Sequence, residues 1–195
     1  MRYLKLFSIL IILSVLIVSC KQEEKFDEKA YSAEFNGYST EYLAGLKGIL
    51  IKNMKEGGPL KAVKVCSDTA QALTNLYSDV MGITVKRVSY QNRNVNDTPD
   101  EFEKEAINKF AELHSQNNLT AETEILKKVK MNEKEVVRFA KPIFIEAPCL
   151  NCHGDANIIS PAVAELIKEK YPNDKATGYK IGDLRGVISI SKVLE

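Results

Sequence analysis

The residues most able to do chemistry stand together in one stretch, Cys149-Leu150-Asn151-Cys152-His153. Two cysteines separated by two residues and followed at once by histidine form the covalent attachment pattern of c-type haem. The two sulfurs can add to the two vinyl groups on one edge of a porphyrin, while the adjacent His153 reaches the iron. The stretch therefore predicts a haem protein that carries one covalently attached haem c.

Three other kinds of site use the same cysteine spacing: half of a zinc site, a redox-active cysteine pair, and a disulfide in a loop. A zinc ribbon needs a second cysteine or histidine pair, and the remaining candidates, Cys20, Cys66 and His114, are scattered singly along the chain. The sequence favours haem over these alternatives, because the N-terminal segment independently indicates export.

That segment has the order of a bacterial signal peptide. Arg2 and Lys5 precede an apolar run over residues 6–18, which is too short to argue for a spanning helix. Ser19-Cys20 then resembles the end of a lipobox, so we expect residues 1–19 to be a lipoprotein signal peptide and Cys20 the lipidated first residue. Ordinary cleavage that leaves the cysteine free is the alternative. Since c-type haem is generally attached outside the cytoplasmic membrane, we expect an exported protein anchored by its lipid on the periplasmic side of a membrane or at the cell surface.

Removal of 19 of the 195 residues leaves 176, which is enough for one domain with a core of its own. Because Arg2 and Lys5 are lost, 25 of the 27 basic side chains remain against 26 acidic ones, a formal charge of −1. That balance predicts no attraction to nucleic acid or to an anionic membrane. Residues 20–32 are rich in Lys, Glu and Asp and predict a flexible tether, followed by the folded domain over 33–195.

The elements that must position the motif mix helices and strands. Helical periodicity begins at Ala33 and stops at Gly57-Gly58, and Pro59 opens a second helix whose apolar stripe contains Cys66. The further predicted elements are a strand over 82–90, a helix over 99–114 behind a Thr98-to-Glu101 capping box, a hairpin of strands 124–131 and 136–146, a helix over 161–170, and a strand over 184–193. This order predicts an α+β domain, with an antiparallel sheet and helices segregated to one side.

Several separated blocks resemble, in the same order, a bacterial single-haem family that was long catalogued as a domain of unknown function. The blocks are residues 62–66, 87–89, 93–100, 149–154, 171–179 and 182–186, and the resemblance covers most of the chain from about Lys61 to Lys192. It implies a PAS-like antiparallel sheet of about five strands with flanking helices, and haem bound through Cys149 and Cys152. It also implies iron held between His153 and a cysteine that matches Cys66. No settled activity follows, since members are proposed to act in redox or gas sensing or as electron carriers.

Cys66 is the cysteine left over once lipid and haem have taken the other three, and an unpaired exported thiol calls for an explanation. A thiolate on ferric iron would be shielded from oxidation, whereas a small buried hydrophobe would need no ligand. The other side chains that could serve the iron are Met54, Met81, Met131 and His114, and an open position is the remaining alternative.

Arg87 and Arg93 are candidates for the haem propionates, because a guanidinium pairs with a carboxylate through two parallel hydrogen bonds. The alternative is that Arg93 belongs only to a polar turn before the next helix. The same two interpretations, a contact with the haem edge or a purely structural role, apply to Lys175, Thr177 and Tyr179.

Two classes of function fit these features. A redox or small-ligand sensor needs a displaceable iron ligand, while a membrane-anchored one-electron carrier needs a fixed six-coordinate iron. Either would act with a redox or signalling protein partner. A peroxidase-like enzyme would require an open iron position and a distal acid or base, and the chain offers one spare histidine, His114. We therefore expect a sensor ahead of a carrier, and no enzymatic activity.

Overall fold

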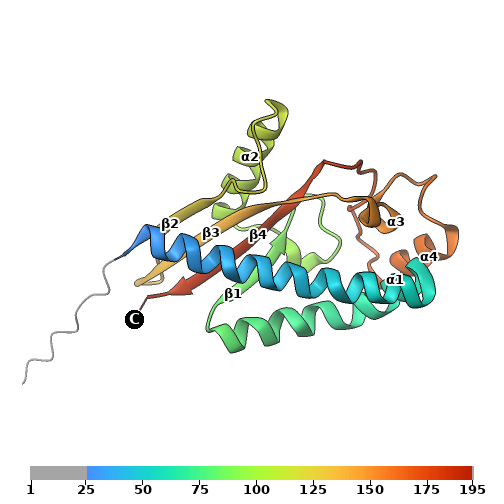
Figure 1. The fold of residues 1–195 in the computed structure, drawn as a ribbon, viewed down its shortest axis with the longest axis horizontal. Coiled ribbons are helices and arrows are strands. Elements are labelled where there is room, and N and C mark those ends of the chain that lie inside the picture. Colours follow the sequence, from blue (N-terminus) through green and yellow to red (C-terminus); the bar gives the residue numbers. More distant parts are fainter. Residues whose placement is uncertain (1–25, 195) are drawn as a thin grey trace, which may run out of the picture.

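Helix α1 (Glu28–Met81) turns back on itself at Gly57 and Gly58 in the computed structural model, which describes residues 26–194. Gly58 has φ 71°, a left-handed conformation that glycine adopts at little cost, and Pro59 then begins the second half. Figure 1 shows the two halves side by side. Tyr42 and Thr74 join them through hydroxyl groups 2.6 Å apart. The predicted stop and restart at these glycines are confirmed.

The start of α1 lies earlier than predicted. Asp27 caps the helix through its side chain, which accepts a hydrogen bond from the amide of Ala30, and Tyr31 is only 5% exposed. Residues 28–32 of the predicted tether therefore belong to α1, because Tyr31 packs on the sheet. The predicted signal peptide, residues 1–19, and the lipidation site Cys20 lie outside the described residues.

The sheet has four antiparallel strands in the order β1-β4-β3-β2. They are β1 (Thr84–Val88), β2 (Ile125–Met131), β3 (Lys134–Phe144) and β4 (Leu184–Val193), and the predicted hairpin is the β2–β3 pair. The sheet thus has one strand fewer than the resemblance implied, and β1 is shorter than the predicted strand over 82–90. The architecture is α+β and PAS-like, as predicted.

The remaining helices are α2 (Glu101–Ser115), α3 (Leu150–His153) and α4 (Pro161–Lys170), with 3-10 turns at Val95–Asp97 and Ala147–Cys149. The capping box at α2 joins Asp100 to Glu103, not Thr98 to Glu101 as predicted, because Pro99 precedes the cap instead of opening the helix. Figure 1 shows α3 and α4 at the end of the domain where α1 turns back, away from the end of β4.

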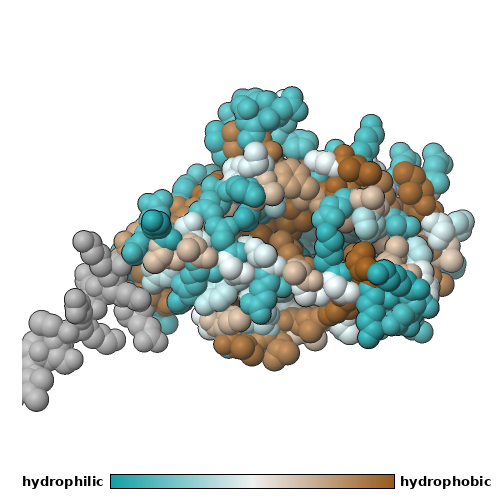
Figure 2. All heavy atoms as spheres, in the orientation of Figure 1, coloured by the Kyte–Doolittle hydropathy of each residue, from teal (hydrophilic) through white to brown (hydrophobic). Residues whose placement is uncertain are grey.

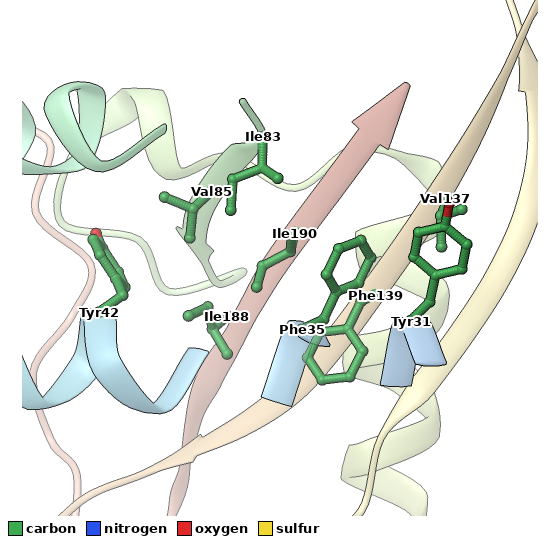
Figure 3. Close-up of a cluster of buried hydrophobic side chains, with 9 residues drawn as sticks. All are labelled: Tyr31, Phe35, Tyr42, Ile83, Val85, Val137, Phe139, Ile188 and Ile190. Atoms are coloured by element: carbon green, nitrogen blue, oxygen red, sulfur yellow. The ribbon is translucent and has the colours of Figure 1, made fainter. Parts of the chain in front are cut away.

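Helices cover both faces of the sheet, so the expectation of helices on one side is wrong. Phe35 of α1 packs edge-on against Phe139 of β3, with ring centroids 5.8 Å apart, in a cluster that includes Ile188 and Ile190 (Figure 3). On the other face, the α2 residues Ala106, Ile107 and Phe110 pack on Val88, Ala140 and Val187. Each strand contributes apolar side chains to both faces, since neighbouring side chains along a strand point to opposite sides of the sheet.

The apolar stripe predicted for the second half of α1 is buried only in part. Val63 is 7% exposed, but Leu76 is 59% exposed, and Val80 in the next turn is 71% exposed. Figure 2 shows apolar side chains gathered over these last turns of α1.

At Gly186, β4 passes close to the end of β1, and this contact gives a test of the fold. A Cβ there would lie 2.3 Å from the carbonyl oxygen of Val88, and the backbone has φ 153°. We expect Gly186→Ala to lower the free energy of unfolding in urea by roughly 1–3 kcal/mol, the usual cost of overpacking. Gly45→Ala, in an open part of α1, is the control and should raise it by about 0.5–1 kcal/mol. Equal stability of the two variants would contradict the β1–β4 packing.

Candidate functional site

The Cys-x-x-Cys-His motif occupies a short helical segment after β3. Cys149 ends the 3-10 turn and caps α3, which contains Cys152 and His153. Cys152 and His153 lie three and four positions after Cys149, a spacing that makes each of them a neighbour of Cys149 on the helix surface. A Cβ on Gly154 would lie 2.6 Å from the carbonyl oxygen of Leu150, so glycine lets the chain leave directly after the histidine.

The loop after α4 holds this segment through its backbone. The amide of Tyr179 donates to the carbonyl of His153 over 3.0 Å, and the amide of Gly178 donates to that of Gly154 over 2.9 Å. The Tyr179 ring stands edge-on to the imidazole, with centroids 6.3 Å apart. His153 is therefore fixed by residues that follow it by more than twenty positions in the sequence.

The imidazole of His153 is neutral. Burial, with the nearby charges of Arg93 and Arg185, lowers its pKa to about 3. Nδ1 lies 2.7 Å from the carbonyl oxygen of Ala176, which can only accept, so Nδ1 carries the proton and donates it. The lone pair on Nε2 is left available, which is the tautomer that a metal-ligating histidine needs, with a carbonyl holding the other nitrogen.

The three cysteines of the described chain are all free thiols. Cys149 packs against Ile145, Ala176 and Tyr179, while Cys152 packs against the cluster that joins α1 to α4. Burial raises the pKa of the Cys152 thiol, although the charge of Arg93 lowers it. The two motif cysteines therefore border two different apolar clusters.

Cys66 comes close to the motif from the second half of α1. Val63, one turn earlier on the same helix face, belongs to the same apolar cluster as Cys152. Burial raises the pKa of the Cys66 thiol, and the nearby charge of Arg87 offsets only part of that rise. No hydrogen bond holds this thiol within residues 26–194. Cys66 and His153 thus approach the same region from different elements.

The structure separates the two arginines predicted for propionates. Arg93 forms an ion pair with Asp174, with Nε and Oδ1 3.1 Å apart, and it also donates to backbone carbonyls. Arg87 makes no side-chain hydrogen bond or ion pair in the described part of the chain, and it lines a cavity of about 450 Å³ with Lys86 and Asp97. An anionic group near Cys66 could therefore take hydrogen bonds from the guanidinium of Arg87, whose charge already acts on Cys66 and Asp97. The contacts of Arg93 favour a positioning role instead.

Arg185 is a residue of this region to which the sequence pattern assigned no role. Its guanidinium lies over the Tyr179 ring, 5.4 Å from the centroid, and donates to the carbonyl of Gln91 over 3.0 Å. Burial lowers its pKa, and its charge is one of those that lower the pKa of His153. The signal available was its place in the resembling block over residues 182–186.

The other predicted residues divide between this region and the rest of the domain. His114 lies at the end of α2, where Nε2 is 2.9 Å from the carbonyl oxygen of Gly182 and the ring packs near Phe144. Met81 packs on the sheet core, and Met131 is 42% exposed at the hairpin. The side chains of Lys175 and Thr177 are exposed.

The alternative sites find little support in this geometry. Within residues 26–194 no three or more His, Cys, Asp or Glu side chains are grouped so that they could hold a bare metal ion. A zinc site therefore lacks a ligand set in the described chain, and Cys149 and Cys152 form no disulfide. The arrangement offers two free thiols and a histidine whose Nε2 is available to a metal.

Comparison with known proteins gives one family and one solved structure. The crystal structure of the cyanobacterial heme-protein Tll0287 is similar, with a TM-score of 0.61 and 25% sequence identity over 82% of this chain and 95% of that chain. No curated protein matches. The model of the Tll0287-like family matches residues 18–192. Because that match spans nearly the whole sequence, the chain belongs to the Tll0287-like family.

Proposed function

We propose that this chain is a c-type haem protein in which Cys149 and Cys152 carry one haem and His153 ligates its iron. The observation that carries the proposal is the hydrogen bond from Nδ1 of His153 to the carbonyl of Ala176, which leaves Nε2 for a metal. The likeness to a structure described as a heme-protein supports the same cofactor.

Denaturing gel electrophoresis followed by haem-peroxidase staining tests this proposal on protein made in a host that attaches c-type haem. The band should keep its stain, because thioether bonds survive denaturation. Haem that washes out in acid acetone would contradict covalent attachment.

The second axial ligand in this proposal is Cys66. Porphyrin supplies four nitrogens, so the iron needs only two protein ligands and no larger cluster of donors. The shared packing of Val63 and Cys152 supports the assignment, because it places this part of α1 beside the motif. Arg87 is the arginine proposed for a propionate, since its guanidinium makes no hydrogen bond or ion pair among the described residues.

The role we propose is that of a redox or small-ligand sensor that a signalling or redox partner reads. Supporting this, hydrogen bonds hold His153, whereas none holds the Cys66 thiol within residues 26–194, so the cysteine is the more easily displaced ligand. A one-electron carrier is the alternative. Ferrous spectra with and without carbon monoxide separate them, because fast binding supports the sensor and inert redox cycling supports the carrier. An enzymatic role is not proposed, since His114 is engaged with Gly182 at the end of α2.

Lipid attachment at Cys20 is proposed as the anchor on the periplasmic side of a membrane or at the cell surface. Within residues 26–194, no helix combines the length and the hydropathy needed to span a bilayer. We expect Cys20→Ala to give protein that is unprocessed or soluble and that takes up no labelled palmitate, because the lipid contributes the membrane affinity. Metabolic labelling with fractionation measures this, and Cys66→Ala is the control that should keep its label. Label retained in Cys20→Ala would contradict the assignment.

A further inference from the structure

We propose that Arg93 and Asp174 form a positioning pair that orients His153 and sets how strongly its imidazole donates to iron. This inference rests on the proposed haem function and adds to it two residues that touch neither thiol nor iron.

The pair is nearly enclosed and bidentate. Nε of Arg93 donates to Oδ1 of Asp174 over 3.1 Å, and Nη2 donates to Oδ2 over 3.2 Å. The two side chains are 14% and 11% exposed. A planar guanidinium that meets a carboxylate through two hydrogen bonds is held in one orientation, which a single contact does not achieve.

Both members of the pair also hold the backbone around the histidine. Nη2 of Arg93 donates to the carbonyl of Cys152 over 2.5 Å and to that of Ala176 over 3.3 Å. Oδ1 of Asp174 accepts from the amide of Ala176 over 2.9 Å. The carbonyl of Ala176 in turn accepts from Nδ1 of His153 over 2.7 Å. Hydrogen bonds therefore fix Ala176 at both its amide and its carbonyl. Because that carbonyl accepts from Nδ1, the fixed position of Ala176 orients the imidazole.

The same contacts give the pair an electronic effect. A guanidinium on the carbonyl of Ala176 draws electron density from it, so this oxygen takes less of the Nδ1 proton than a free carbonyl would. Loss of the cation should let the imidazole gain anionic character, and an anionic ligand favours ferric iron. Loss of the Asp174 charge leaves the cation unbalanced and should act in the opposite direction. Because Ala176 is fully buried, water cannot take the place of either contact.

The test is the midpoint potential and the ferric electron paramagnetic resonance spectrum of the haem-loaded parent, Arg93→Gln and Asp174→Asn. Partners of metal-ligating histidines change metal binding by about tenfold or more when they are removed. A tenfold change in the preference for ferric over ferrous iron corresponds to about 59 mV for one electron. We expect the potential to fall in Arg93→Gln and to rise in Asp174→Asn. Both variants should also show altered g values.

Arg138→Gln is the matched control. Arg138 is 6% exposed and pairs with Asp100 over 2.8 Å at the start of α2, so its loss should lower stability without moving the potential. If Arg93→Gln does not fold, Asp174→Asn decides alone, because asparagine keeps an oxygen for the amide of Ala176.

The outcomes separate this inference from the proposed function. Parent protein without covalent haem would overturn both. Parent protein with haem, together with potentials and spectra that match it in both variants, would overturn the positioning pair alone. Potential shifts of the same sign in both variants would also overturn the positioning pair, because they would indicate a loosened fold instead of the loss of two opposite charges.

Discussion

Alanine at both Cys149 and Cys152 is expected to abolish covalent haem attachment and to lower the thermal stability of the domain. Haem stain should fall to background, because no thioether can form. A ligand that binds only the native state and is present at a thousand times its Kd stabilises that state by about 4 kcal/mol. For a domain of this size that is a fall in Tm of roughly 8–16 °C. Each cysteine also packs against a different apolar cluster, so both substitutions remove packing contacts and should lower stability further.

Haem-peroxidase staining and thermal unfolding followed by circular dichroism measure the two effects. Cys149→Ala alone is the control, since Cys152 can still form one thioether and should keep part of the stain. Full staining of the double variant would show that the motif is not the attachment site.

Cys66→Ser is expected to change the spin state of the ferric iron and to raise its midpoint potential. A thiolate donates more strongly than a hydroxyl and favours the ferric form, so its loss should convert a low-spin thiolate-type spectrum to a high-spin or differently ligated one. Axial ligands set haem potentials over roughly 0.8 V, and we expect a rise on the order of 100 mV. Cys66 is half-buried, and Val63, one turn earlier on α1, belongs to the cluster that includes Cys152, which is why Cys66 is the thiol proposed for the iron.

Electron paramagnetic resonance and a redox titration measure this change. Ser67→Ala is the control, because Ser67 is the next residue on α1 and its hydroxyl bonds to Lys64 and Asp68 away from the motif. A Cys66→Ser variant whose spectrum and potential equal those of the parent would exclude Cys66 as the ligand.

The bounds of an element could be predicted from the sequence where residues next to its ends determine where it starts and stops. The predicted strand over 184–193 and the helix over 161–170 have the bounds of β4 and α4, because Pro161 and the Tyr171-Pro172 step act within one turn. The reversal of α1 at Gly57-Gly58 followed in the same way. The start of α1 was misplaced although Asp27 is an N-cap residue, because the charged residues around it resemble a tether and the burial of Tyr31 on the sheet depends on the tertiary structure.

The proposed chemistry of the motif rests on five consecutive residues, because the pattern for covalent attachment and one axial ligand is defined by residue type and spacing. The surroundings of His153 depend on the fold. Arg93 and Asp174 are 81 positions apart, and the acceptor for Nδ1 is a backbone carbonyl, a group that every residue possesses. The way β1, β4 and the loop after α4 meet decides whether Arg93 faces a cofactor or a carboxylate. It also places Arg185 near the imidazole. The pairing of β1 with β4 and the hydrogen bond from the amide of Lys175 to the carbonyl of Asn92 bring these segments together, and side-chain types along the chain do not encode those contacts.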